Sequence, residues 1–409
     1  MPKKFKVVQQ MNYRLWVLTL GNFTVGTGSL IVAGILPAIA ASLDTSVAMA
    51  GQLVTIYGLS LAVGAPLLGI ATRHVDRRPL MLSGLGIFVL ACLLGAFAPN
   101  FKMLVLSRVL AGIGAALFTP NAAVLAAHLV RPERRGRAIA LVFAGFSLAS
   151  VVGVPLGTFV GGAFGWRSAF ALVGVLALLA MGFLAQTLPH GTQVPSVSAR
   201  NWFRLFRQKA PMLTVITTVL GMAGQYALFT YIAALLLQLH GIGPTGLSAL
   251  LVWFGLAGLL GNTLAGKWVD RMGAAQVAHF GIGILLSAFI MLAFSGASLL
   301  LTIVAMGLWG AAAFAVSSAQ QTRLVNQDSR LASATLALNA SALYVGQAGG
   351  AMLGGLAISF IGFPFALWTG IMLLAAALAV SIWESLLPRR KQSEEHWRTL
   401  PSSSVPRPR

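Results

Sequence analysis

The chain has 409 residues, of which 57% are hydrophobic and only 9% are charged. Soluble domains are roughly 45–50% apolar and about 25% charged, so this composition excludes a water-soluble globular protein and indicates an integral membrane protein. The net charge of +20 would suit a nucleic-acid partner, but the basic residues are concentrated in loops between apolar runs. We therefore interpret the charge as a topology signal and expect no nucleic-acid partner.

Twelve apolar runs follow one another along the chain, each long enough for the ~20 residues that a membrane-spanning helix needs. They predict an all-α integral membrane protein in which the lipid bilayer is the surrounding medium. The first run is too long for the apolar region of a cleaved signal, so we expect it to be the first span. The predicted spans lie near residues 15–39, 48–71, 80–98, 103–127, 138–161, 168–188, 213–237, 246–266, 277–296, 299–319, 333–357 and 364–386.

The basic residues predict the orientation of these spans. If the spans alternate across the membrane from a cytoplasmic N-terminus, all Lys and Arg residues except three lie on the cytoplasmic side. Lys102 and Arg167 fall outside, and Arg108 falls within a span. This bias predicts a multi-pass protein of the inner (cytoplasmic) membrane with both termini in the cytoplasm.

The two halves of the chain repeat one plan. Eight glycines recur at an offset of 197 positions, for example Gly58 with Gly255 and Gly153 with Gly350. We therefore predict two pseudo-symmetric bundles of six helices, with a binding site between them. The predicted parts are an N-terminal bundle over 1–188, a cytoplasmic linker over 189–210, a C-terminal bundle over 211–387 and a disordered cytoplasmic tail over 388–409.

The linker mixes aromatic side chains with basic ones around Trp202 and Phe206. This mixture is typical of a short helix on an anionic membrane surface, although an ordinary solvated loop remains an alternative.

Small residues recur at helical spacing in the fifth and eleventh spans, where they share one helix face. Such a face allows close approach of a neighbouring helix, either as static packing or as a sliding contact between the halves. Pro155 is expected to bend the fifth span. This predicted helix-contact ridge consists of Gly145, Gly153, Pro155, Gly157 and Gly161, with Gly346, Gly350 and Gly354.

Two tight cytoplasmic turns carry clustered charges and suggest a gate. Exposed ion pairs contribute only about 0–1 kcal/mol each, so several would have to act together. A purely topological role for the charges is the alternative. The predicted gate comprises Gly69, Arg73, Asp76, Arg77 and Arg78 in the first half, and Gly266, Asp270 and Arg271 in the second.

Arg108 is the one formal charge inside a predicted span. It either serves transport or reaches the interface by snorkelling. The eight acidic residues all fall in loops, span ends or the tail, so no carboxylate is expected at the membrane centre. The remaining candidates for a coupling residue are His128 and, at span ends, Asp44 or Asp76. The single Cys92 and the scattered histidines predict no metal site, no cofactor and no enzyme.

Polar and aromatic residues near mid-span define a candidate substrate cavity without fixed charge, which suits a neutral or amphipathic small molecule. Each aromatic residue could instead pack in the core or face lipid. The predicted cavity residues are Asn22, Thr27, Ser29, Tyr57, Gln225, Tyr226, Phe229, Trp253, Trp309, Tyr344 and Gln347.

Several short motifs resemble signatures of the major facilitator superfamily, most closely its twelve-span proton-driven drug and sugar exporters of the arabinose-efflux-permease type. They are Gly266-x-x-x-Asp270-Arg271-x-Gly273, Arg108-x-x-x-Gly112-x-Gly114, Gly153-Val154-Pro155-Leu156-Gly157, Arg134-Arg135-Gly136-Arg137-Ala138 and Gly165-Trp166-Arg167-x-x-Phe170.

The resemblance implies a monomeric exporter of a drug, sugar or metabolite that works by alternating access as a proton antiporter. Two positions depart from the pattern: Ser29 stands where that branch usually carries an acid, and Arg73 stands where it has Asp. A uniporter or importer on the same fold, without proton coupling, is therefore the alternative.

Overall fold

The computed structural model describes residues 3–72, 74–131, 134–188, 205–296, 298–327 and 332–387, with the side chains of 3–12 and 332–333 excepted. Twelve helical segments in these ranges are long and apolar enough to cross a membrane, which confirms the predicted all-α fold. Most of the predicted linker and all of the predicted tail lie outside the described residues.

The helices of the first half, in chain order, are α1 (Lys3–Ser42), α2 (Val47–Ala71), α3 (Arg77–Ala96), α4 (Phe101–His128), α5 (Arg135–Leu148), the π-helical turn η2 (Ala149–Gly153), α6 (Val154–Phe164) and α7 (Trp166–Thr187). Those of the second half are α9 (Lys209–Phe229), α10 (Ile232–His240), α11 (Pro244–Met272), α12 (Ala274–Ala293), α13 (Leu299–Gln327), α14 (Ala332–Phe360) and α15 (Phe363–Leu386).

Two of the spans are interrupted. In the fifth, η2 joins α5 to α6 because Pro155 has no N–H, and the Val154 N–H bonds to the carbonyl five residues back, at Ala149. In the seventh, the chain leaves helical geometry at Tyr231, whose N–H bonds to Leu228 O, before α10 begins. Each interruption lies where the two halves of the chain meet.

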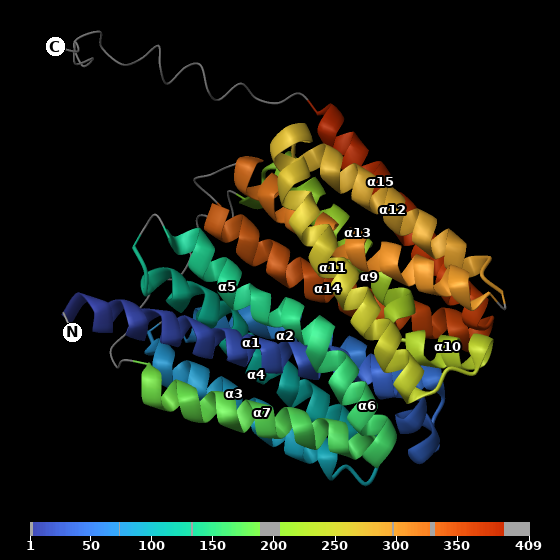
Figure 1. Ribbon diagram of the computed structural model, residues 1–409, viewed down its shortest axis with the longest axis horizontal. Coiled ribbons are helices and arrows are strands. Elements are labelled where there is room, and N and C mark those ends of the chain that lie inside the picture. Colours follow the sequence, from blue (N-terminus) through green and yellow to red (C-terminus); the bar gives the residue numbers. More distant parts are fainter. Residues whose placement is uncertain are drawn as a thin grey trace.

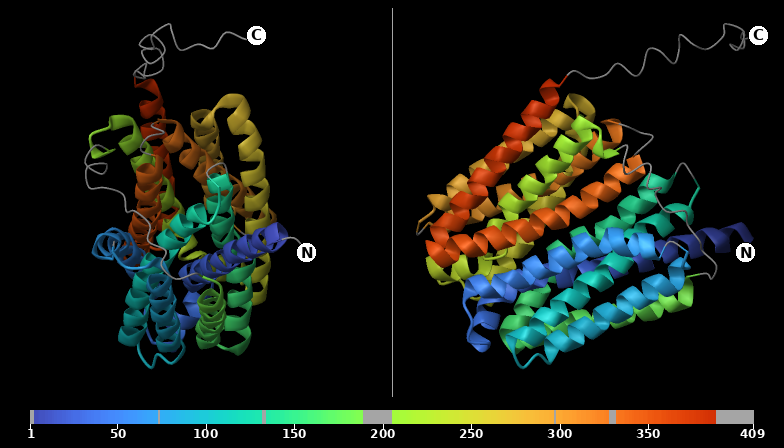
Figure 2. Two further views of the ribbon diagram at one scale, coloured as in Figure 1. Left: turned by 90° about the vertical axis from the view of Figure 1, so that its left-hand side faces the viewer. Right: turned by 180° about the vertical axis from the view of Figure 1, so that it is seen from behind.

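Helices α1–α7 pack mainly on one another, and helices α9–α15 do the same (Figure 1). Helix α1 starts and α15 ends on one side of the molecule, which we call the terminal side; the opposite side is the far side (Figure 2). Contacts between the two groups run through α2 with α14, through α11 with η2 and α6, and through α1 with α10.

These contacts lie at the centre and toward the far side. A Cβ added at Gly58 on α2 would lie 3.1 Å from Tyr344 O on α14, and one added at Gly162 would lie 2.3 Å from Pro244 Cβ. Toward the terminal side the two groups of helices diverge (Figures 1 and 2). The two groups are therefore joined on the far side and separated on the terminal side.

Candidate functional site

Two polar side chains meet where α1 of the first half faces α14 of the second. The Gln347 amide donates to the Ser29 hydroxyl at 3.5 Å, and both residues are buried. Tyr57 on α2 is buried nearby, with Ser29, Tyr344 and Arg108 close to its hydroxyl. The Ser29 hydroxyl is its hydrogen-bonding neighbour, but the geometry between them is too poor for a regular hydrogen bond, so the centre holds a weakly satisfied polar group.

An aromatic cluster lies beside this centre in the second half. Trp309 is fully buried, and its indole N–H donates to Gln225 Oε1 at 3.2 Å. Its ring lies edge-on to Phe229, with centroids 5.9 Å apart, and Phe229 in turn lies 5.6 Å from Tyr226. Such edge-to-face pairs hold the rings in fixed orientations.

Two members of the cluster were missed by the sequence analysis. Phe254 and Phe289 lie 5.5 and 4.8 Å from the Trp309 ring. They are apolar residues of apolar spans, and nothing in the sequence distinguishes them from lipid-facing phenylalanines.

Three of the expected cavity residues are placed elsewhere. Trp253 is 42% exposed, and its indole donates to Ile303 O on α13 rather than facing the centre. Asn22 donates to Val142 O on α5. Thr27 donates to Phe23 O within α1 and packs on Gly153. Asn22 and Thr27 therefore join α1 to the fifth span.

Arg108 does not snorkel. Its side chain is only 1% exposed, and its guanidinium donates to Gly28 O at 3.2 Å and to Ser107 Oγ at 3.1 Å. It also lies 4.6 Å from the centre of the Phe170 ring, a cation–π distance. The cation thus links α4 to α1 and α7 beneath the central Tyr57.

A second buried arginine, which the sequence analysis did not single out, lies past the end of a predicted span. Helix α13 continues to Gln327, past the end of the apolar run, and carries Arg323 in its buried face. The Arg323 guanidinium pairs with Glu384 on α15 and donates to Ser381 Oγ at 2.7 Å. The side chain of Glu384 is 10% exposed, so this is a buried ion pair near the terminal side.

In this conformation the predicted helix-contact ridge packs within each half and not between the halves. An added Cβ at Gly145 would lie 2.2 Å from Thr19 O, and Gly157 and Gly161 pack on Ile31 and Ile35 of the same helix α1. In the second half the corresponding residues, Gly346, Gly350 and Gly354, pack on the backbone of α9. Both ridges lie inside their own half, which is the static-packing alternative.

The predicted gate residues of the first half bond within that half. Arg77 donates to Asn121 Oδ1 at 2.9 Å, Arg78 donates to Ala185 O, and Asp76 caps the start of α3. Those of the second half, Asp270 and Arg271, are exposed at the end of α11. Arg73 lies outside the described residues.

His128 is the exposed last residue of α4, away from the centre. Over the residues that the structure describes, no three His, Cys, Asp or Glu side chains converge to hold a metal ion.

Comparison with known proteins identifies the family. Residues 18–253 and 215–407 match the family model described as Major Facilitator Superfamily. The inner membrane transport protein YdhP of Escherichia coli K12 is 32% identical over 388 residues, which cover 94% of this chain and 98% of that protein. The purine ribonucleoside efflux pump NepI of Escherichia coli K12 is 28% identical over 349 residues, covering 85% of this chain and 88% of the pump.

Among solved structures, a bacterial homolog of the human lysosomal transporter Spinster, in an inward-facing and occupied conformation, superposes with a TM-score of 0.77. The match covers 91% of this chain and 96% of that one at 19% identity, and it shows the shared fold. With this fold, these relatives and the family match over both halves, the chain belongs to the major facilitator superfamily, a family of membrane transporters and not of enzymes.

Proposed function

We propose that this transporter exports a small neutral or amphipathic organic solute across the inner membrane by alternating access. The observation that carries the proposal is the polar centre between the halves, where the Tyr57 hydroxyl is buried beside Ser29 and Gln347 bridges to the same serine. A solute hydroxyl or amide is suited to bond with the tyrosine hydroxyl and to replace the amide bridge, which is long and easily broken.

The neighbouring rings favour a solute with a planar part. Trp309, Phe229 and Phe254 offer ring faces and edges beside Gln225, whose amide can bond a polar substituent. Purine ribonucleosides combine a planar base with several hydroxyls and carry no charge at neutral pH, and NepI is an efflux pump for them. We propose solutes of this chemistry, nucleosides and comparable neutral aromatic drugs, as the substrate class.

The arrangement of the halves supports alternating access. The terminal side is open and the far side is closed, with Tyr231 of the second half seated against Gly51 of the first. With both termini in the cytoplasm, as the basic loops predict, this conformation would take up solute from the cytoplasm. Export then requires the far side to open.

Transport by the purified protein in liposomes tests the proposal. Tyr57→Phe removes only the central hydroxyl and should lower transport of the best nucleoside by about tenfold, since one hydrogen bond to a buried group contributes about 1 kcal/mol or slightly more. Tyr13→Phe makes the same chemical change at an exposed site and should transport normally. If the unsubstituted protein transports no member of a panel of nucleosides and neutral aromatic drugs, this result would count against the proposal.

Proton antiport is the coupling that we propose, on the strength of the family resemblance. The second candidate is a uniporter or importer without proton coupling. It is favoured by the described acids, because Asp44 and Asp270 are exposed and Glu384 is paired with Arg323, which leaves none of them at the centre. If an imposed pH gradient drives accumulation of the solute and an uncoupler abolishes it, the result supports antiport. If counterflow of the solute does not depend on the pH gradient, the result supports the uniporter.

A further inference from the structure

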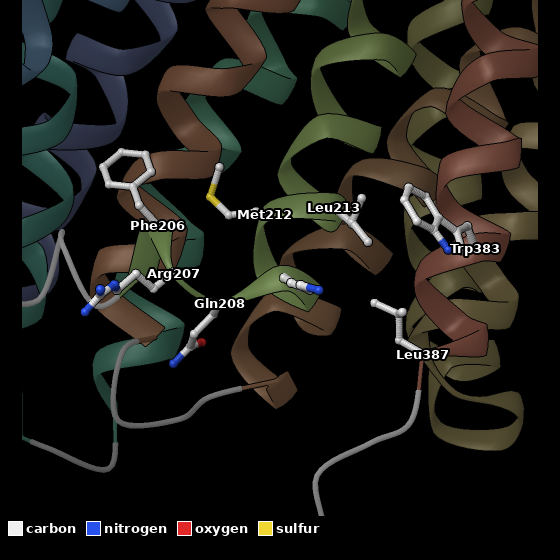
Figure 3. Close-up of a pocket in the computed structure, with 8 residues that line it drawn as sticks. Phe206, Arg207, Gln208, Met212, Leu213, Trp383 and Leu387 are labelled. Atoms are coloured by element: carbon white, nitrogen blue, oxygen red, sulfur yellow. The ribbon is translucent and has the colours of Figure 1, made fainter.

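A surface groove of about 320 Å³ lies on the terminal side, between the start of α9 and the end of α15 (Figure 3). It is formed by the end of the segment that connects the two halves together with α9 and α15, and its lining residues are not those of the central site. Its lining consists of Phe206, Arg207, Gln208, Lys209, Met212, Leu213, Trp383 and Leu387.

The walls of the groove are apolar and accessible. Trp383 is 58% exposed and Phe206 is 55% exposed, and the two face the groove from opposite ends with Met212 and Leu213 between them (Figure 3). The apolar lining residues Met212, Leu213, Trp383 and Leu387 lie on α9 or at the end of α15, two helices long and apolar enough to span the membrane, so an acyl chain in the groove would lie next to the bilayer. An indole at the end of a membrane helix is the usual marker of the headgroup level.

The rim of the groove is positively charged. Lys209 and Arg207 both contribute to it, and none of the described residues that line it is acidic. Helix α9 begins at Lys209 and has 21 residues, and the Gln208 side chain does not cap it. Its first N–H groups therefore add the positive end of a helix dipole to the two cations, and such an end favours a bound phosphate.

We infer that this groove binds an anionic phospholipid, with the headgroup phosphate at Lys209 and the start of α9, and one acyl chain between Phe206 and Trp383. A soluble phosphate compound would use the cations but would leave the apolar walls exposed. The position at the ends of two membrane helices, where basic residues meet the anionic leaflet, supplies a lipid with both features at once. The groove joins the segment that connects the two halves to the last span, so a lipid there would hold that segment at the membrane surface.

Lipid binding to the full-length protein in neutral detergent tests this inference, with native mass spectrometry as the readout. Phosphatidylglycerol should remain bound at lipid concentrations at which phosphatidylcholine no longer binds. Lys209→Glu should weaken phosphatidylglycerol binding by about fivefold or more, since each basic residue near an anionic lipid contributes on that scale. Trp383→Ala should weaken it as well, because the apolar wall is removed while the charge is kept.

Lys267→Glu is the matched control, because Lys267 is exposed on the same side at the end of α11 but does not line the groove. Equal loss with Lys209→Glu and Lys267→Glu would overturn the inference in favour of a diffuse charge effect. Competition by inorganic phosphate at millimolar concentration, with no effect of Trp383→Ala, would overturn it in favour of a soluble anion.

A third outcome concerns the chain itself, which continues beyond Leu387 to Glu394 and Glu395. If Glu394→Gln with Glu395→Gln raises the affinity for phosphatidylglycerol, the lipid and the tail compete for one site, and the lipid assignment is supported. If wild-type protein binds no phosphatidylglycerol and this variant binds none either, the groove is not a lipid site. Each readout is binding, so it is independent of whether the proposed solute is transported.

Discussion

Tyr231 packs directly on Gly51, so we predict that a single methyl group added at Gly51 will change the equilibrium between the conformation that is closed on the far side and the one that is open there. An added Cβ at Gly51 would lie 2.2 Å from Tyr231 Cε1 and 2.3 Å from its hydroxyl. The ring cannot move aside freely, because it is fully buried and its hydroxyl donates to Ala351 O at 2.7 Å. Overpacking of this kind costs about 1–3 kcal/mol.

This cost applies only while the far side is closed, because the two groups of helices meet at Gly51 only then. Gly51→Ala should therefore shift the equilibrium about 5- to 150-fold toward the conformation that is open on the far side. A reporter cysteine at Ala48, which is buried on the same face of α2, becomes accessible in that conformation. Labelling with a membrane-impermeant maleimide, in a Cys92→Ala background, should be correspondingly faster in right-side-out vesicles.

Gly182→Ala on α7 is the control, since an added Cβ at Gly182 meets no atom within 4 Å and the residue is not part of the predicted gate. Its labelling rate should equal that of the parent. If Gly51→Ala also labels at the parental rate while the protein remains folded, the closed far side is not held by this contact, and the reasoning is refuted.

Three further outcomes are expected. Arg108→Ala should abolish solute transport in liposomes while the protein still inserts into the membrane, because the cation that joins α4 to α1 and α7 is lost; full transport would contradict this role. Gly153→Leu should lower the thermal stability in detergent, by an amount corresponding to about 3 kcal/mol, because its side chain must displace α1; an unchanged melting temperature would contradict the packing. Arg323→Ala should cost about 3–5 kcal/mol by leaving the Glu384 carboxylate buried and unpaired, and adding Glu384→Gln should restore part of the loss in the same melting assay.

The twelve helices could be predicted because length and apolarity alone decide whether a segment can span a bilayer. The ends of the helices could not. Helix α13 extends past its apolar run to Gln327, since a buried face can continue beyond the membrane when a partner satisfies its polar groups. The pair of Arg323 with Glu384, which lies in that extension, was therefore missed.

The candidate site was predicted in part, for a geometric reason. Depth along a span can be estimated from the sequence, but the rotation of a helix about its axis and its neighbours cannot. Trp253 and Trp309 both lie within long apolar spans, yet one faces outward and the other packs at the core of the aromatic cluster. Ser29 and Gln347 were both chosen by depth, but only the packing of α14 on α2, beside α1, brings them together.

The same limit explains the helix-contact ridge and suggests how the halves move. Spacing identified a face of small residues on the fifth span, but not the helix that it touches. Gly157 fixes that span to α1, while the Val151 side of η2 meets Gly255 of the second half. The glycine face holds each half together by close packing. A change of conformation that leaves both halves intact therefore needs to break only the contacts between the halves, such as that of Val151 with Gly255. The contacts at Gly255, Gly58 and Gly51 are therefore the ones in which a substitution should change the conformational equilibrium, whereas substitutions in the ridge should change the stability of one half.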